Sequence, residues 1–358
     1  MTIRQVNTGN LFEDFHLGQK FNHGVPRTLT QADASIYLSL TGQRFALNCS
    51  QVLSKECGFK AIPIDNLLVF HIAFGKTVTD ISLHAIANLG YAEVKFETPV
   101  FAGDTIEVTS EVIGLKQNSN GQSGIVYVHS LATNQAQQTV VSWIRWVMVP
   151  TRIKKFFDPK SAIKKIPHYQ NSLHAEQLII PTKTDFAAWR ASVSDYQFTI
   201  NDLNIGDELF HQDGITINAA DHMQATHLYQ NNARVHFNRH QMQQTNHQTP
   251  LVYGGHVISL CRAISYNGLA NTIWLVAINS GEHTAPTYAD DTIYCYSTIL
   301  DKQPIEHRHD VGLIRIALTG YKNLLVQPQQ INATDSLETL IPNSQIVLKL
   351  DYWALMII

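Results

Sequence analysis

The stretch LGQKFNHGVPRTLTQADASIYLSLTG at residues 17–42 returns in altered form as IGDELFHQDGITINAADHMQATHLYQ at residues 205–230. When the two are aligned, Gly18 meets Gly206, and the offset of 188 (206 − 18) holds along the whole stretch. Histidine, threonine and aspartate recur at matching places. Self-similarity at a fixed offset is the sequence signature of a duplicated unit. The sequence therefore predicts two copies of one fold.

The same offset continues toward the end of each copy. PVFAGDTIEV matches PTYADDTIYC, where Pro99 meets Pro286 at an offset of 187 (286 − 99). SGIVYV then matches VGLIRI, with Gly124 opposite Gly312 at 188 again (312 − 124). A length of 358 residues suits two domains, and an apolar content of 44% lets each half bury a core.

Each copy has the same expected order of elements. A helix begins after Thr30 and another after Asn218, because each precedes helical spacing of apolar residues and has an aspartate three residues later. A longer apolar helix follows at 66–78 and at 254–269. Strand patterns then occupy 92–100, 104–116, 124–134 and 138–149 in the first copy, and 272–279, 291–300, 312–318 and 345–358 in the second.

This order predicts an α+β fold in which an antiparallel sheet curls around a central helix, twice in the chain. We expect an N-terminal unit at 1–155, a linker at 156–195 and a C-terminal unit at 196–358. Near the junction lies a lysine cluster, which fits either a solvated linker or an electrostatic contact with a phosphorylated ligand. Its members are Lys154, Lys155, Lys164 and Lys165.

Composition excludes several classes of protein. A net charge of −3 gives no basic surface for nucleic acid. The four cysteines form no CxxC spacing and no signal peptide precedes them, so we expect reduced thiols and a cytoplasmic protein. No apolar run reaches the ~20 residues that span a bilayer, so no membrane partner is expected.

The run PVFAGDTIEVTSEV, together with the element order, resembles the MaoC-type hydratases. Longer stretches, including HMQATHLYQNNARVHFN and YGGHVISLCRAISYNGL, closely resemble the mesaconyl-CoA hydratase subfamily, across about residues 10–325. The resemblance implies two tandem hot-dog units, a double hot-dog. It also implies reversible loss of water from a β-hydroxyacyl-CoA, above all β-methylmalyl-CoA to mesaconyl-CoA. No cofactor is implied beyond the CoA of the substrate, and a homodimer is one expected assembly.

Hydratases of this group carry Asp-x-Asn-Pro-x-His before the central helix. Fitting that motif by its last residue places His236 on the histidine and Asn231 on the aspartate. In the first copy the equivalent positions are Gln43 and Asn48, and amides do not exchange protons at neutral pH. The resemblance thus predicts one catalytic site, in the C-terminal unit, with a catalytically degenerate N-terminal unit that helps to hold the CoA arm.

The start of the second central helix carries further candidates. Gly254 and Gly255 let the thioester approach the backbone N–H groups of a helix N-terminus, where an enolate oxygen is stabilised. The first copy has no glycine at the equivalent place. His256 follows directly and is either a second imidazole of the site or a histidine at a helix end with a structural role.

The implied substrate carries a free carboxylate, for which an arginine is the natural partner. Arg234 is the first candidate and Arg262, on the apolar central helix, is the second. The acid that replaces the family aspartate is Glu282 or Asp221, unless His236 acts alone. Asp221 also fits a helix-capping role, because its equivalent persists in the first copy.

Three other functions stay open at this stage: another enoyl-CoA hydratase, a hot-dog thioesterase, and a non-catalytic acyl-CoA binding module. The retention of histidine and glycines in only one copy argues against the last. A metal site is not expected, because the His-rich segment HFNRHQMQQTNH has the composition of a loop and lacks a helical ligand pair.

Overall fold

A computed structural model of the chain describes residues 6, 8–152, 164–187, 189, 198–327, 329, 331 and 336–358. Lys154 and Lys155 of the predicted lysine cluster lie outside these residues, whereas Lys164 and Lys165 form a two-residue strand, β6, beside strand β3. The exact domain bounds at 155, 156, 195 and 196 also lie outside the described residues and stay a prediction.

The first copy contains four helices and five strands among its described residues, beginning with an edge strand. In chain order they are β1 Lys20–Thr28, α1 Gln31–Thr41, α2 Ala46–Cys49, α3 Gln51–Glu56, α4 Asn66–Lys76, β2 Ala87–Phe96, β3 Thr105–Gln117, β4 Ser123–Thr133 and β5 Thr139–Pro150.

The second copy has the same strand order, but one short helix precedes its central helix, one follows it, and one stands before its last strand. Its described elements are β7 Glu208–Thr216, α5 Ala219–Leu228, α6 Arg239–Met242, α7 Gly254–Ile264, α8 Tyr266–Leu269, β8 Thr272–Glu282, β9 Thr292–Gln303, β10 Val311–Lys322, α9 Leu337–Leu340 and β11 Ile346–Ile357. The predicted α+β fold of two tandem hot-dog units is confirmed.

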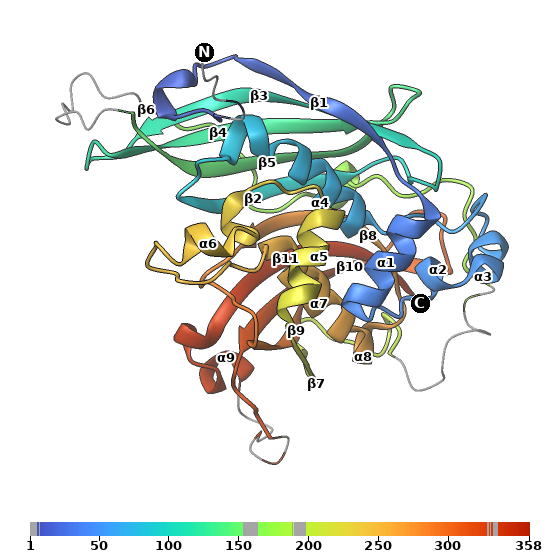
Figure 1. Cartoon of the computed structure of the whole chain (residues 1–358). Coiled ribbons are helices and arrows are strands. Elements are labelled where there is room, and N and C mark those ends of the chain that lie inside the picture. The colour runs from blue at the N-terminus through green and yellow to red at the C-terminus, as the bar shows by residue number, and fades with distance from the viewer. Residues whose placement is uncertain are drawn as a thin grey trace.

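All of these strands belong to one sheet, which Figure 1 shows as a continuous curved layer with α1, α4, α5 and α7 on one face. Its order is β1-β3-β4-β5-β2-β8-β11-β10-β9-β7, so each half mirrors the other. The halves join where β2 pairs antiparallel with β8, and there Ala92 faces Ser280, its own repeat equivalent (280 − 92 = 188). A pseudo-two-fold axis therefore passes through the middle of the sheet.

Local hydrogen bonds repeat with the sequence. His23 Nε2 bonds Ser110 Oγ at 2.7 Å, and His211 Nε2 bonds Ser297 Oγ at 2.9 Å in the second copy. The N-terminus of α1 is closed by Thr30, whose side chain accepts from the Asp33 N–H while Asp33 accepts from the Thr30 N–H. The equivalent His–Ser bonds show that the two copies share side-chain contacts as well as the course of the backbone.

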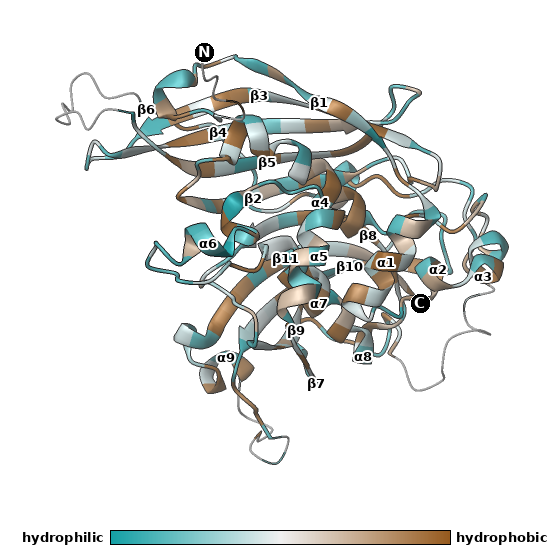
Figure 2. Ribbon diagram, viewed as in Figure 1, coloured by the Kyte–Doolittle hydropathy of each residue, from teal (hydrophilic) through white to brown (hydrophobic). Residues whose placement is uncertain are grey.

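The core lies between the sheet and the two central helices. Every residue of α4 is buried, and so is nearly all of α7, which explains why both helices are apolar on most faces. Along β4 and β5 buried positions alternate in part with more exposed ones, and Figure 2 shows hydrophobic and hydrophilic residues following one another along several strands. The central strands β8 and β11 are instead buried along nearly their whole length.

Two features of the sheet differ from the sequence expectation. The edge strands β1 and β7 were not predicted, because both are largely polar and each contains a bulge in its pairing, between His23 and Arg27 in β1 and between His211 and Ile215 in β7. The meander holds for β3, β4 and β5 and for β9, β10 and β11, whereas β2 pairs with β5 and β8, and β8 pairs with β11 and β2.

The two halves also touch through α4 and the chain after α5. The Cα of Gly75 lies so close to the carbonyl oxygen of Tyr229 that a side chain at position 75 would overlap it. Backbone atoms cannot move aside as a flexible side chain can, so this glycine sets how closely the copies approach.

Gly75→Ala is therefore expected to lower the unfolding free energy by about 1–3 kcal/mol, the usual cost of overpacking a core. Urea unfolding at constant pH measures the change. Gly24→Ala is the matched control, because the space beside Gly24 is open and its backbone needs no left-handed conformation. Equal stability of the two variants would contradict the proposed close approach.

Candidate active site

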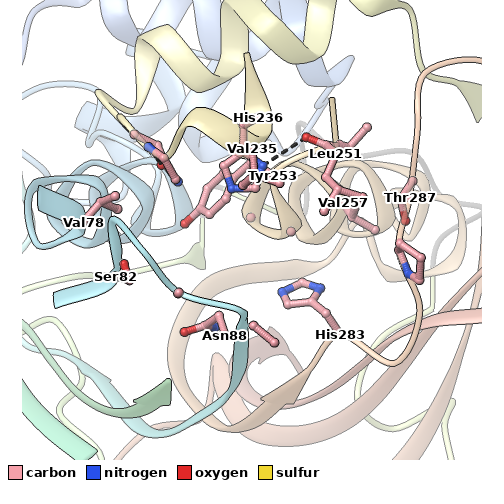
Figure 3. A pocket seen from close by; sticks show the side chains of 18 of the residues that line it. Val78, Ser82, Asn88, Val235, His236, Leu251, Tyr253, Val257, His283 and Thr287 are labelled. Atoms are coloured by element: carbon pink, nitrogen blue, oxygen red, sulfur yellow. Dashed lines mark hydrogen bonds between the residues drawn. The ribbon is translucent and has the colours of Figure 1, made fainter. Parts of the chain in front are cut away.

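A cavity of about 550 Å³ lies between the two copies, on the side of the loop that precedes α7. The first copy contributes α4 and the segment from Val78 to β2, and the second copy contributes the loop 231–236, the start of α7 and the chain after β8. Figure 3 shows Val78 and Ser82 at one end of the cavity, Thr287 at the other, and His236 and His283 on opposite sides between them. The cavity is thus a joint product of both copies.

His236 lines this cavity on a short 3-10 turn, Arg234–His236. Its Nδ1 lies 3.0 Å from the carbonyl oxygen of Leu251, and a carbonyl only accepts, so Nδ1 carries the proton. Nε2 is then the basic nitrogen. Burial lowers the pKa of His236 to about 4, so the ring is neutral at pH 7.

Asn231 also lines the cavity and holds the loop that carries His236. Its side-chain oxygen accepts a hydrogen bond from the Ala233 N–H at 3.0 Å, an Asx turn. The residue at the family's aspartate position is therefore used for loop geometry in this structure, and a carboxylate is not required for that bond.

The two glycines at the start of α7 line the cavity and make room for imidazole rings. A side chain on Gly254 would overlap His283, and one on Gly255 would overlap Tyr253 and His71. The absence of both side chains therefore lets two histidines, one from each copy, approach the N-terminus of α7.

That helix N-terminus has no side-chain cap: Tyr253 is its N-cap residue and makes no capping bond. The equivalent residue of the first copy is Asp65 (253 − 188), whose carboxylate accepts from the Leu67 N–H at 2.8 Å and so caps α4. Because the first N–H groups of a helix have no partner inside the helix, α7 offers donors to a ligand where α4 offers none.

The first copy has equivalent hydrogen bonds at the corresponding position, but side chains fill the space that is open in the second copy. Asn48 Nδ2 donates to the Pro63 carbonyl at 3.1 Å, the counterpart of the bond between His236 and Leu251. Gln43 donates to Asp65 at 2.8 Å. Only about 20 Å³ of space remains there, which is too little for an acyl group.

The other predicted site residues divide by position. Arg234 lines the cavity. Arg262 does not line this cavity. It lies beside the small space that remains at the equivalent position of the first copy, with its guanidinium 3.6 Å from the centre of the Phe45 ring. His256 is buried in α7 away from the cavity lining, and Glu282 is exposed on the outer face of β8.

Asp221 lies in the first turn of α5 and accepts a hydrogen bond from the Asn218 side-chain nitrogen at 3.2 Å, but Asn218, the N-cap residue, makes no side-chain capping bond to the helix. The structure brings His236, Asn231, Arg234, Gly254 and Gly255 together and leaves the remaining candidates outside the cavity.

The sequence reasoning missed several cavity histidines, and two of them lie at the start of α7. His71 of α4 lines the cavity, bonds Ser259 Oγ at 3.0 Å through Nε2 and has no partner at Nδ1 among the described residues. His283 follows β8 beside Glu282 and faces inward. A histidine in an otherwise apolar helix was an available signal for His71, and alternation along β8 would have separated His283 from Glu282.

Burial keeps these rings neutral as well. The pKa of His71 falls to about 3, and that of His283 to about 4, with a further lowering by His236. Within the described residues, no group of three or more histidine, cysteine or acidic side chains could hold a metal ion. No helix among them has the length and apolarity needed to cross a membrane.

Comparison with known proteins decides the family. A family model described as mesaconyl-CoA hydratase matches residues 3–323. The chain belongs to this family. A β-methylmalyl-CoA dehydratase of Chloroflexus aurantiacus is 47% identical over 319 residues, covering 89% of this chain and 90% of that one. A mesaconyl-CoA hydratase of Cereibacter sphaeroides is 41% identical over 353 residues, covering 98% and 99%.

Solved structures show the same double hot-dog fold. A MaoC domain protein dehydratase from Chloroflexus aurantiacus has a TM-score of 0.89 at 43% identity and covers 99% of each chain. A double hotdog protein from Mycobacterium tuberculosis, with a TM-score of 0.77 at 23% identity over 99% of this chain, shares the fold.

The neutral histidines predict how stability depends on pH. His256 has a folded-state pKa of about 4, below the ordinary value of 6.5, so between these values the unfolded chain binds a proton that the folded chain does not. Its contribution to the unfolding free energy is complete above pH 6.5 and is lost, at about 1.4 kcal/mol per pH unit, as pH falls toward 4.

We expect His256→Leu to flatten this dependence by about one proton. Urea unfolding of both proteins at several values between pH 7 and pH 5 measures the slope. Equal slopes of unfolding free energy against pH for the two proteins would contradict this prediction, because His256 would then bind its proton equally well in the folded and unfolded states.

Proposed function

We propose that this protein is a hydro-lyase that adds water to mesaconyl-CoA and removes it from β-methylmalyl-CoA. The observation that carries the proposal is the pairing of a neutral, oriented His236 with an uncapped helix N-terminus in one cavity. Two relatives with 47% and 41% identity carry the names of the two directions of this reaction. The reaction needs no cofactor, because CoA enters as part of the substrate.

The chemistry of hydration assigns a role to His236. Water adds to the β-carbon, and a base must take one of its protons as the carbon–oxygen bond forms. Nε2 of His236 is the basic nitrogen, because the Leu251 carbonyl holds the proton on Nδ1. A neutral imidazole is the form required of a base, and its low pKa keeps it neutral at working pH.

Addition of water places negative charge on the thioester oxygen. The N–H groups at the start of α7, next to Gly254 and Gly255, are the donors that stabilise this enolate. The first copy supports the assignment by contrast, because Asp65 there would repel an oxyanion from the equivalent helix end. The α-carbon then takes a proton, so that one water is added in full.

We assign the second proton-transfer group to His283, in place of the family's aspartate. Its ring lies over Gly254 and faces His236 across the cavity. Burial, and then His236, lower the pKa of His283, which fits two imidazoles that face one substrate. Arg234 adds positive charge to the cavity lining for the anionic substrate, and His256 acts behind the site as a neutral core residue.

A panel of acyl-CoA substrates tests the function. We expect the enoyl thioester absorbance to fall when enzyme is added to mesaconyl-CoA and to appear with β-methylmalyl-CoA, with weaker changes for crotonyl-CoA. A thiol reagent distinguishes the thioesterase alternative, because hydrolysis releases free CoA and hydration does not. Free CoA as the main product, or no change with any thioester, would refute the proposal.

His236→Asn places in the C-terminal copy the residue that the first copy has at the same position. The amide can still donate to the Leu251 carbonyl, as Asn48 does to Pro63, but it has no basic nitrogen. We expect kcat to fall by roughly 10²–10⁴-fold with the fold intact.

His309→Asn is the matched control, since His309 is exposed on the loop after β9, away from the cavity. Turnover of His236→Asn close to that of this control would remove His236 from the mechanism.

A further inference from the structure

Arg145 is a fully buried arginine next to the cavity. It lies on β5 between Trp143 and Val147, on the inward face of the strand, and is 0% exposed. Its guanidinium is 4.3 Å from the centre of the Phe74 ring and 3.5 Å from Ser82 Oγ. Phe74 and Ser82 both line the cavity, so Arg145 stands directly behind its wall.

The charge of Arg145 is not balanced by the described residues. Nε and Nη1 have no hydrogen-bond partner among them, and the bond to Ser82 is long. Burial lowers the pKa of Arg145 to about 9, so the group is still a cation at pH 7. An unpaired buried charge is costly, and proteins rarely keep one without a compensating ion.

The second copy provides an internal comparison. Phe74 and Arg262 are repeat equivalents (262 − 74 = 188), and strand register makes Tyr352 the equivalent of Arg145. Each copy thus holds one arginine against one aromatic ring, with the two positions exchanged.

Arg262, which lies beside the filled space of the first copy, has several partners. Arg262 donates to Ser265 at 3.2 Å and to Thr272 Oγ1 at 2.6 Å, and the Asp65 carboxylate acts on its charge. Arg262 thus has hydrogen-bond partners beside a space that is filled, whereas Arg145 stands under-bonded beside an open cavity. What Arg145 lacks is an anion in that cavity.

We propose that Arg145 and Ser82 form a subsite that selects acyl-CoA substrates with a free carboxylate at the far end of the acyl group. The Ser82 hydroxyl makes the direct contact, and Arg145 supplies the positive charge behind it. This inference rests on the proposed function and names the specificity determinant of the same cavity.

The order of the residues along the cavity fits the order of the groups in such a substrate. Figure 3 shows Ser82 and Val78 on one side of His236 and His283, and Thr287 on the other. A carboxylate at Ser82 leaves the α- and β-carbons between the two histidines and directs the thioester toward the start of α7. Phe74 and Val78 close this end with apolar surface, in which a single charge interaction acts strongly.

Binding of two unreactive thioesters tests the subsite without turnover. Succinyl-CoA ends in a carboxylate, and butyryl-CoA has a methyl group in its place. We expect Arg145→Met to weaken succinyl-CoA binding by about 10–100-fold and butyryl-CoA binding by about threefold or less, the range for a hydrogen bond to a charged group. Isothermal titration calorimetry measures both, and Arg145→Lys is expected to restore part of the difference.

Equal weakening of both thioesters, or of neither, would overturn the proposal. So would a loss confined to Arg234→Leu, measured in parallel, because Arg234 would then hold the carboxylate. The same pattern in kcat/KM is expected for mesaconyl-CoA against crotonyl-CoA. Failure of the wild-type protein to hydrate any thioester would refute the proposed function, whereas the binding comparison still decides the subsite.

Thermal unfolding separates a ligand-binding arginine from a structural one. We expect Arg145→Met to unfold no lower than the wild-type protein, because it removes an unpaired buried charge. Arg262→Met is expected to unfold lower, because it removes the hydrogen bonds of the guanidinium to Ser265 and Thr272. A large loss of stability in Arg145→Met alone would assign it a structural role. Ser82→Ala, at a partly exposed position, is the second variant and should show the same loss of discrimination.

Discussion

The antiparallel pairing of β2 with β8 is the constraint on which the rest of the structure depends. It joins two hot-dog units into one sheet and sets a pseudo-two-fold axis at Ala92 and Ser280. The same axis brings α4 and α7 together, so that His71 bonds Ser259, a residue 188 positions later. Each potential site therefore takes its helix start from one copy and its wall from the other. Neither copy could form the cavity alone.

A symmetric scaffold with two equivalent places can lose one site without losing its fold. In the first copy Asp65 caps the helix, and Arg262 and Phe45 fill the space, so the polar groups satisfy one another. In the second copy the corresponding cap and filling are absent, and imidazoles surround an open volume. Stabilising interactions have thus replaced catalytic capacity on one side of the axis.

The sequence was sufficient for the fold because duplication, capping pairs and strand alternation are local signals. It also brought His236 and the two glycines to the cavity lining, because the family motif and the helix start lie close together in the sequence, whereas their catalytic role stays a prediction. It could not place His71 or Arg145, since these reach the cavity only through packing across the axis. Arg262 shows the converse error: an arginine in an apolar helix does require partners, but these are Ser265 and Thr272 of its own copy and not a substrate. The polar edge strands β1 and β7 were missed because neither has a buried face of its own.

The protonation states of the groups in and behind the cavity are set mainly by burial and less by pairing with opposite charges. Burial keeps His236 and His283 neutral, so that each can accept a proton. Burial also leaves the charged guanidinium of Arg145 with two nitrogens that have no hydrogen-bond partner among the described residues. A substrate with one carboxylate and one polarised thioester complements both conditions: the carboxylate balances the cation, and the neutral rings exchange protons with water and carbon. A substrate without the carboxylate would meet the same bases but would leave the buried cation unbalanced. Under the proposed function, selectivity for a dicarboxylic acyl group would follow from the same low polarity of the cavity that keeps the imidazoles neutral.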